Sequence, residues 1–369
     1  MKNNYNKWFL FIMASVLLAK TSYAQNTPTL KQVFKNNFLI GAALNAAQIS
    51  GKDTLAAPLI KTQFSAITPE NIMKCEVIHP SWDKYNFDLA DKIVAYGNQN
   101  NLPVNGHTLI WHSQLSPFVK QIQSKDSLLQ FIKNHITTIA SRYDGKIFSW
   151  DVVNEALEED GSLRNSIFLE KLGPDYISEA FSIAAAAAPQ TELYYNDYNI
   201  EQPKKRAGAI ALIKNLQSKG IRINGVGIQG HWRSDNIPLK EIEESILAFS
   251  ALGIKVMFTE LDLTVLPNPW DVDAADVNQK AVYNEKMNPY AAGIPDSAQQ
   301  KLTNGYESLF KLFYKYSDKI NRITFWGVHD KQSWLNGWPI AGRTNYPLLF
   351  DRNGKPKPAY YKVIAVGKP

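Results

Sequence analysis

Short apolar runs alternate along the chain with longer stretches in which apolar residues recur at helical spacing. This alternation is typical of a parallel sheet whose strands are connected by helices. Eight runs rich in β-branched and aromatic residues are predicted strands: Phe38–Leu44, Gln63–Thr68, Val104–Leu109, Phe148–Val153, Leu193–Asn196, Gly225–Gln229, Lys255–Glu260 and Arg322–Gly327. Clear helical periodicity is found in three intervening stretches, Asp88–Gln99 (with Asp88 as N-cap), Asp126–Tyr143 and Ser297–Tyr316. Eight strands with helices between them favour an α/β fold of one closed (β/α)8 TIM barrel over an open sheet.

Polar or aromatic residues stand at the end of every predicted strand. In chain order they are Asn45; Glu70 and Asn71; His107, Trp111 and His112; Asn154 and Glu155; Asn196 and Asp197; Gln229 and His231; Glu260 and Asp262; Trp326, His329 and Asp330. In a barrel of parallel strands these ends converge on one face, which is where barrel enzymes carry the active site. Loops are exposed to water, so some polar residues are expected there in any fold. The concentration of tryptophan, histidine, carboxyl and amide side chains is what indicates a functional face.

Two glutamates occupy similar positions in this pattern. Glu155 closes the segment Trp150-Asp-Val-Val-Asn-Glu, and Glu260 closes Val256-Met-Phe-Thr-Glu. Each is predicted to lie where a buried strand emerges into a loop, and the fourth and seventh strands lie across the barrel from each other. Glycosidic-bond cleavage requires two carboxyl groups, about 5–5.5 Å apart for retention and about 6.5–9.5 Å apart for inversion. A structural ion pair is the alternative role for either glutamate.

The nine tryptophans are consistent with carbohydrate binding, because sugar rings present apolar C–H faces that stack on aromatic side chains. Trp111, Trp326, Trp334 and Trp338 fall in segments assigned to the functional face. Core packing is the commoner role of an isolated tryptophan, but Trp334 and Trp338 lie among Ser, Asn, Gly and Pro, which favours exposure. The longest irregular stretch, Pro267–Pro295, is interpreted as a loop at the rim of the site or, equally well, as a surface excursion without function.

The length of 369 residues, with 45% hydrophobic and 20% charged residues, fits one globular barrel domain. Residues 1–24 have the pattern of a signal peptide: Lys2 and Lys7 precede an apolar run, and Ser22-Tyr23-Ala24 is a small-x-small cleavage site. An uncleaved anchor or a buried N-terminal helix is the alternative. The prediction is a catalytic domain of residues 25–369, exported to the periplasm or the medium and free of the membrane.

Composition and motifs argue against several other classes. Removal of the leader with its three lysines reduces the 40 basic residues to 37, against 34 acidic ones, and no basic run is visible, so nucleic acid is not an expected partner. Cys75 is the only cysteine, which excludes an intramolecular disulfide. The histidines lack zinc-site spacing, a Gly-x-Ser-x-Gly elbow is absent, and Gly225–Gly230 lacks the lysine of a phosphate loop. A monomer without metal or cofactor is expected.

Ten segments, in a fixed order between Leu30 and Val363, carry a resemblance to a known family. They are Thr68–Lys74, Gly106–Gln114, Trp150–Ala156, Tyr195–Asn199, Gly227–His231, Phe258–Asp262, Phe325–Asp330, Ser333-Trp334, Leu348–Asp351 and Lys357–Tyr360. Together they resemble glycoside hydrolase family 10, the endo-β-1,4-xylanase family. The resemblance covers nearly the whole chain after the leader.

The resemblance implies a (β/α)8 barrel that hydrolyses xylan or xylo-oligosaccharides with retention, by double displacement. It implies that Glu155 is the acid/base and Glu260 the nucleophile, with His231 bonded to the nucleophile, Asp262 behind His231, and Asn154 on the sugar 2-hydroxyl. The other residues that it implies for substrate binding or its support are Glu70, Asn71, Lys74, His107, Trp111, Gln114, Asn196, Gln229, Trp326 and Trp334.

Two positions depart from the family pattern. Cys75 stands where a tryptophan usually follows the lysine, and His112–Phe118 shifts the usual proline and aromatic residue. Both bear on the affinity of the subsites and not on the two glutamates. Three alternatives stay open: a non-catalytic carbohydrate-binding protein on the same barrel, a metal-dependent barrel hydrolase, and a cellulase or mixed β-glucanase that uses the same chemistry.

Overall fold

The computed structural model describes residues 28–269 and 276–368, so the predicted signal peptide lies outside the described residues. The strands are β1 (Leu39–Leu44), β2 (Ala66–Pro69), β3 (Asn105–Trp111), β4 (Ser149–Asn154), β5 (Glu192–Asp197), β6 (Gly225–Ile228), β7 (His231–Arg233), β8 (Lys255–Thr264) and β9 (Ile320–Phe325). The α-helices are α1 (Leu30–Val33), α2 (Ala46–Ile49), α3 (Ala56–Gln63), α4 (Cys75–Ile78), α5 (Asp88–Asn100), α6 (Pro117–Lys120), α7 (Lys125–Tyr143), α8 (Ile167–Leu172), α9 (Tyr176–Ala187), α10 (Pro203–Ser218), α11 (Leu239–Ser250), α12 (Asp296–Lys315) and α13 (Pro358–Val366). Short 3-10 turns are η1 (Glu285–Met287), η2 (Asp330–Gln332) and η3 (Trp334–Asn336).

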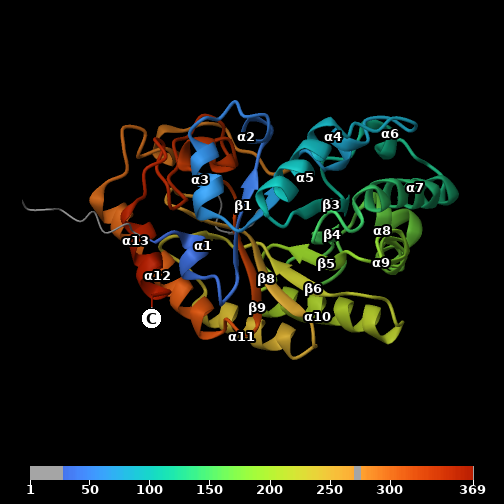
Figure 1. Cartoon of the computed structure of the whole chain (residues 1–369). Coiled ribbons are helices and arrows are strands. Elements are labelled where there is room, and N and C mark those ends of the chain that lie inside the picture. Colours follow the sequence, from blue (N-terminus) through green and yellow to red (C-terminus); the bar gives the residue numbers. More distant parts are fainter. Residues whose placement is uncertain (1–27, 270–275, 369) are drawn as a thin grey trace, which may run out of the picture.

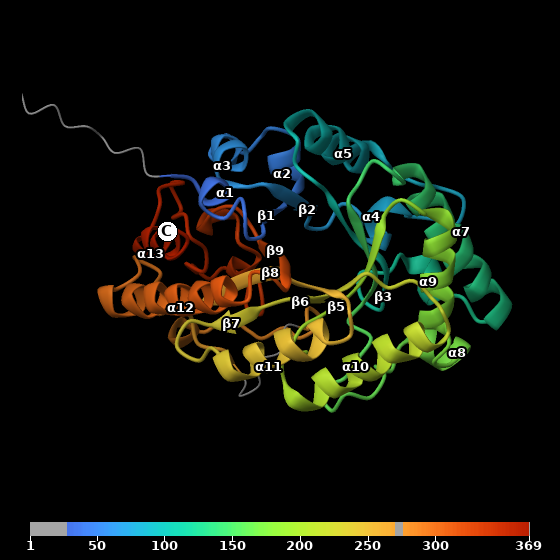
Figure 2. The ribbon, with the colours of Figure 1, turned by 60° about the horizontal axis from the view of Figure 1, so that its bottom comes forward.

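Eight strands form the barrel in the order β2-β1-β9-β8-β6-β5-β4-β3, and each hydrogen-bonded pair in this series is parallel. The two ends of the series meet at a parallel bridge between Ile67 and Val104, where the Ile67 amide donates to the Pro103 carbonyl oxygen at 3.0 Å. The longer helices surround the strands (Figures 1 and 2). The predicted single (β/α)8 TIM barrel is therefore confirmed.

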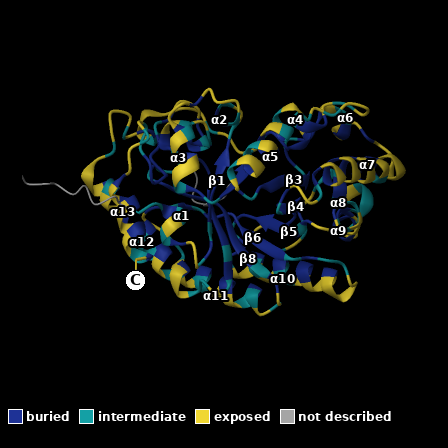
Figure 3. Ribbon diagram, viewed as in Figure 1, coloured by how far each residue is buried: buried dark blue, intermediate teal, exposed yellow. Residues whose placement is uncertain are grey.

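The strands are buried almost throughout, whereas the helices are buried on one side (Figure 3). The predicted inward face of α7 is buried at every position: Leu128, Phe131, Ile132, His135, Ile136 and Ile139. The same holds for the predicted face of α12: Leu302, Tyr306, Leu309, Phe310 and Phe313. Burial of one such apolar side chain contributes about 1.5–3 kcal/mol, so these stripes hold the helices against the barrel.

Close packing inside the barrel leaves room for no side chain at Gly106. This residue pairs with Trp150 on the neighbouring strand, and a Cβ atom at Gly106 would lie 2.2 Å from the fully buried indole ring. Glycine is therefore required at this position for steric reasons.

The boundaries of four predicted strands differ from those observed by more than one residue. Gln63 belongs to α3, so β2 begins at Ala66; β3 continues to Trp111; and β9 begins at Ile320. The largest difference concerns β8, which continues past Glu260 to Thr264 and pairs there with the unpredicted strand β7. Glu260 therefore lies inside a strand and not at its end. Glu155, by contrast, directly follows β4 as predicted.

The extension of β8 follows from its alternation of side chains. Glu260 and Asp262 share one face of the strand because side chains alternate in direction, while Leu261 and Leu263 are fully buried on the other face. The pairing of β8 with β9 shifts register between Phe258 and Leu261, where a bulge breaks the regular ladder. Charged residues that resemble the start of a loop are thus accommodated within the strand.

Two further predictions concern the helices and the long loop. The helix predicted from Asp88 begins there, but Asp88 is its first residue and Phe87 occupies the N-cap position. Within the described part of the long loop, Val277 lines the central cavity described below, as expected for a loop at the rim. Among the described residues, no helix combines the length and the apolar character that crossing a membrane requires.

Candidate active site

A cavity opens at the C-terminal ends of the barrel strands. Its lining residues are Glu70, Asn71, Lys74, His107, Trp111, Gln114, Asn154, Glu155, Gln229, His231, Glu260, Val277, Trp326, Trp334 and Trp338. All predicted site residues except Asn196 and Asp262 are in this set, and these two are buried directly behind it. The barrel thus brings together side chains from segments that span more than 260 positions of the sequence.

Glu155 presents its carboxyl group to the cavity from the first position after β4. The Trp111 indole Nε1 donates to Oε2 at 2.7 Å, and the Gln229 amide Nε2 donates to Oε1 at 2.9 Å. Burial raises the pKa of Glu155, and the negative charge of Glu260 raises it further. Both effects disfavour a second anion in the same cavity, so Glu155 is the carboxyl group that retains its proton more readily.

Glu260 has the opposite electrostatic setting. Asn196 Nδ2 lies 2.8 Å from its Oε1, and His231 Nε2 lies 3.2 Å from its Oε2. Burial opposes the charge of Glu260, but the hydrogen bond from His231 and the positive charge of Lys74 contribute to an opposing effect that outweighs it. The pKa of Glu260 therefore lies below its usual value, and this carboxyl group is the anion of the pair.

His231 is held between two carboxylates. Its Nδ1 lies 3.0 Å from Asp262 Oδ1, while its Nε2 faces Glu260. Burial opposes a charged imidazole, but Asp262 and Glu260 together raise the pKa of His231 to about 10. Only a protonated imidazole can donate from both ring nitrogens, so this geometry requires the cation. The Trp334 indole donates to the other oxygen of Asp262 at 2.7 Å and completes the arrangement.

Asn196 and Gln229 each form hydrogen bonds with both Glu155 and Glu260. The carbonyl oxygen of Asn196 accepts from the Glu155 amide at 2.9 Å, while its side chain donates to Glu260. Gln229 does the reverse: its carbonyl oxygen accepts from the Glu260 amide at 2.8 Å, and its side chain donates to Glu155. These two residues come from β5 and from the end of β6, the two strands between β4 and β8. The relative position of the two carboxyl groups is therefore fixed by adjacent strands.

Polar donors line the wall beside Glu155. Lys74 Nζ donates to Asn71 Oδ1 at 2.9 Å and to Gln114 Oε1 at 3.0 Å, and lies 4.7 Å from the centre of the Trp111 ring. Burial lowers the pKa of Lys74, although the nearby glutamates oppose this effect. Asn154 accepts a hydrogen bond from Asn196 at 2.9 Å, but its buried Nδ2 has no partner in the structure. This donor is therefore unsatisfied in a residue that lines the cavity.

Aromatic side chains form the opposite wall. Trp326 packs edge-on against His107 at a ring-centre distance of 5.4 Å, and His107 Nδ1 is anchored to Asp151 at 2.9 Å. Trp334 and Trp338 stack at 4.6 Å; both line the cavity but are half-buried and not exposed as predicted, because their indole groups are hydrogen-bonded and packed against each other. The cavity thus combines three carboxyl groups, those of Glu70, Glu155 and Glu260, with a row of donors and flat apolar surfaces.

The predicted family is found by comparison with known proteins. The sequence pattern described as "Glycosyl hydrolase family 10" matches residues 29–366. The chain belongs to glycosyl hydrolase family 10. Membership in this family makes the protein a glycoside hydrolase, and the glutamates of the cavity are its candidate catalytic groups.

Two relatives and one solved structure are similar to this chain over nearly their whole length. An "Endo-1,4-beta-xylanase A" from Xylanibacter ruminicola is 43% identical over 360 residues, which cover 96% of this chain and 97% of the relative. A "Beta-1,4-xylanase" from Dictyoglomus thermophilum is 38% identical over 349 residues, covering 94% and 93%. The solved structure of an endoxylanase of this family from a sugarcane soil metagenome has a TM-score of 0.87 and 42% identity, covering 91% of this chain and 99% of that one.

Cys75, one of the two departures from the family pattern, lies outside the cavity. It is buried, its Sγ lies 3.7 Å from Ser116 Oγ, and this hydroxyl donates to the His79 carbonyl oxygen at 2.7 Å. Cys75 therefore packs behind Lys74, whereas the second departure, His112–Phe118, contributes Gln114 to the cavity lining of this family 10 enzyme.

Sequence reasoning missed some members of the site. Val277 and Trp338 line the cavity; both lie in segments that were predicted for the functional face or its rim, but neither was named as a site residue. Asp151, which anchors His107 from within β4, was not predicted at all. A charged residue in a buried strand, as at Asp151, is a signal that could have been used, because it requires a polar partner. Among the residues that the structure describes, no group of three or more His, Cys, Asp and Glu side chains could hold a metal ion.

Proposed function

We propose that the protein is an exported, retaining endo-β-1,4-xylanase that uses no cofactor. The observation that carries the proposal is the opposite displacement of two pKa values in one cavity: Glu155 upward and Glu260 downward. A proton donor and an anion on a sugar-binding cavity are the two groups that glycosidic-bond cleavage needs. The names of the similar family members support β-1,4-xylan as the substrate.

In the first step, Glu260 attacks the anomeric carbon of the sugar in the central subsite. The bond between this carbon and the glycosidic oxygen breaks, and Glu155 transfers its proton to the departing oxygen. The products are a shortened chain with a free hydroxyl group and an ester between the sugar and Glu260. The hydrogen bonds from Asn196 and His231 keep the attacking carboxylate oriented and ionised.

In the second step, Glu155 acts as a base. It takes a proton from a water molecule, the resulting hydroxide oxygen attacks the anomeric carbon, and the ester bond to Glu260 breaks. Both carboxyl groups return to their initial protonation states. Two inversions at the same carbon give net retention of configuration.

Substrate binding is assigned to the two walls. In this proposal, Asn154 Nδ2, which has no partner in the structure, donates to the 2-hydroxyl group, and Lys74, with Asn71 and Gln114, makes polar contacts to the neighbouring sugar. The stacked indole rings of Trp334 and Trp338 offer flat surfaces for the C–H faces of the sugars. In the same proposal, residues 1–24 direct export and the mature enzyme acts as a monomer in the periplasm or the medium.

The test combines product analysis with two isosteric variants. Wild-type enzyme should release reducing ends from xylan and much less from cellulose, and NMR should show the β-anomer as the first product. Glu260→Gln and Glu155→Gln should each lower turnover of xylan by several orders of magnitude. Asp235→Asn, a half-exposed surface carboxylate paired with Arg233, is the matched control and should retain activity. An initial α-anomer, or near wild-type activity of Glu260→Gln, would overturn the assignment.

A further inference from the structure

Glu155 has a backbone conformation that its own side chain disfavours. Its φ angle is +54°, in the left-handed region, which residues other than glycine adopt only when their surroundings hold them there. Two hydrogen bonds fix the peptide planes on either side. The Glu155 amide donates to the Asn196 carbonyl oxygen at 2.9 Å, and the Glu155 carbonyl oxygen accepts from Arg164 Nε at 3.0 Å. The first bond is made by a barrel strand, whereas the second depends on one side chain.

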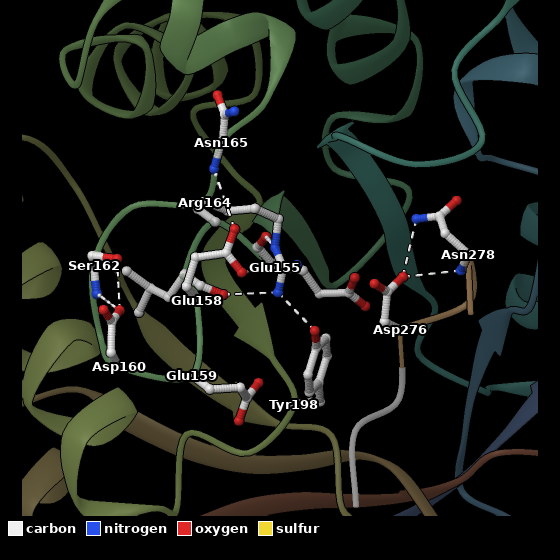
Figure 4. A network of polar contacts seen from close by, with 12 residues as sticks. Glu155, Glu158, Glu159, Asp160, Ser162, Arg164, Asn165, Tyr198, Asp276 and Asn278 are labelled. Carbon is white, nitrogen blue, oxygen red and sulfur yellow. Dashed lines mark hydrogen bonds and ion pairs between the residues drawn. The ribbon is translucent and has the colours of Figure 1, made fainter. Parts of the chain in front are cut away.

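Arg164 forms several hydrogen bonds with the turn after β4 (Figure 4). Its Nη2 donates to the Leu157 carbonyl oxygen at 2.8 Å and to the Tyr198 hydroxyl group at 2.7 Å. Its own amide donates to the Ala156 carbonyl oxygen at 2.7 Å. A guanidinium group has five donors in a rigid plane, so it can satisfy two carbonyl groups and a hydroxyl group at once. The direction of the Glu155 carbonyl group is thereby fixed.

Arg164 does not contact the substrate cavity. It is buried, it does not line that cavity, and its charge is balanced by Glu158 at 3.3 Å. It borders instead a second, small cavity behind Glu155, together with His112 and Tyr176. The hydrogen bonds of Arg164 therefore reach the substrate cavity only through the turn that carries Glu155.

We infer that Arg164 is a positioning residue for the acid/base Glu155, an inference that rests on the proposed function. The carbonyl group that Arg164 holds sets the ψ angle of Glu155, and ψ sets the direction in which the carboxyl group enters the cavity. A displacement of about 1 Å at a reacting group is enough to lower the rate about 100-fold. Proton transfer to the leaving oxygen is the step that suffers, because the nucleophile Glu260 is held by other residues.

The test compares leaving groups in the variant Arg164→Lys, which keeps the charge but loses the planar donors. The substrates are aryl β-xylobiosides, from the dinitrophenyl compound, whose leaving group needs no proton, to the unsubstituted phenyl compound. The variant should lose about 100-fold in kcat/KM on the phenyl substrate and only a few-fold on the dinitrophenyl substrate. Glu155→Gln should show the same trend more strongly. The ratio of the two rates does not depend on the folded fraction, so partial unfolding does not obscure the result.

The second step provides an independent readout. On the dinitrophenyl substrate, a misplaced base should slow hydrolysis of the sugar–Glu260 ester and lower kcat. Azide attacks the anomeric carbon without needing a base, breaks the same ester bond and releases a β-xylobiosyl azide. Added azide should therefore raise kcat of Arg164→Lys and have no such effect on the wild type.

The matched control is Arg206→Lys, which removes a similar set of donors between α10 and α11. Arg206 donates to the Glu241 carbonyl oxygen at 3.1 Å and to Glu244 at 2.7 Å, outside the cavity. It should show neither leaving-group dependence nor azide rescue. An equal loss on all substrates without rescue by azide, or full activity of Arg164→Lys on xylan, would overturn the inference. Absence of the trend in Glu155→Gln would instead overturn the proposed role of Glu155.

Discussion

Replacing Asp262 with asparagine removes one of the two negative charges that keep His231 protonated. Asp262 is 1% exposed, and its Oδ1 lies 3.0 Å from His231 Nδ1. The increase of the His231 pKa from 6.5 to about 10 corresponds to about 5 kcal/mol in favour of the charged imidazole. Asp262 contributes more to this increase than Glu260 does. Asp262→Asn should therefore remove at least half of the free energy that favours the charged imidazole of His231, about 2.5 kcal/mol.

The consequence for catalysis passes through Glu260. About half of the preference for the charged imidazole remains, so His231 stays protonated at acidic pH but loses its proton at a lower pH than in the wild type. The neutral imidazole then donates from Nδ1 to the asparagine oxygen and turns the lone pair of Nε2 toward the carboxylate of Glu260. On the alkaline side, kcat/KM of Asp262→Asn should therefore fall more steeply with pH than that of the wild type.

The same substitution should change the pH dependence of stability. His231 binds its proton more tightly in the folded chain than in the unfolded one. Its contribution to stability is therefore complete below pH 6.5 and is lost as the pH rises toward about 10. The free energy of unfolding of the wild type should decrease across this interval, by up to about 5 kcal/mol from this group. Asp262→Asn should show about half of that decrease.

Urea denaturation across this pH range and pH profiles of kcat/KM test both statements. The control Asp53→Asn breaks another buried carboxylate–imidazole contact, Asp53 with His329 at 2.9 Å, outside the cavity. It should change stability and leave the alkaline limb in place. Coincident alkaline limbs in Asp262→Asn and the wild type would refute the role of the His231–Asp262 contact in holding the His231 proton beside Glu260.

Three other outcomes follow from the structure. Lys205→Met should lower the free energy of unfolding by about 3–5 kcal/mol, measured in urea, because the buried Lys205 lies 3.1 Å from the buried Asp197 and 3.0 Å from Glu159; an unchanged midpoint would contradict this. Gly106→Ala should lower stability by about 1–3 kcal/mol, seen as a reduced melting temperature, because its Cβ would lie 2.2 Å from Trp150. EDTA should leave the rate of xylan hydrolysis unchanged, since the proposed reaction uses two carboxyl groups; a loss that zinc restores would favour a metal-dependent hydrolase.

The periodicity of apolar residues was sufficient to place the barrel strands and the inward faces of the helices. The predicted strand Phe148–Val153 and the observed β4 differ by one residue at each end. These elements can be predicted because the residues that one face of a helix or strand buries recur at a fixed spacing within a short segment of the sequence. The convergence of polar strand ends on one face could be predicted for the same reason, since every parallel strand ends on the same side of the barrel.

The seventh barrel strand shows where local patterns are insufficient. Glu260 and Asp262 resemble the beginning of a loop, yet β8 continues to Thr264. Charged side chains can remain in the strand because His231 and Trp334 provide hydrogen bonds, and these partners lie 29 and 72 positions away in the sequence. Residue spacing within one segment contains no information about such partners.

The two glutamates illustrate the same division. Their residue type, and for Glu155 the position after its strand, are visible in the sequence, and the resemblance to family 10 suggested a role for each. The physical difference between them arises from the folded chain: burial beside another carboxyl group raises the pKa of Glu155, whereas the hydrogen bond from His231 helps to lower that of Glu260. A pKa depends on the charges and donors within a few ångströms, and these neighbours come from strands that only folding brings together.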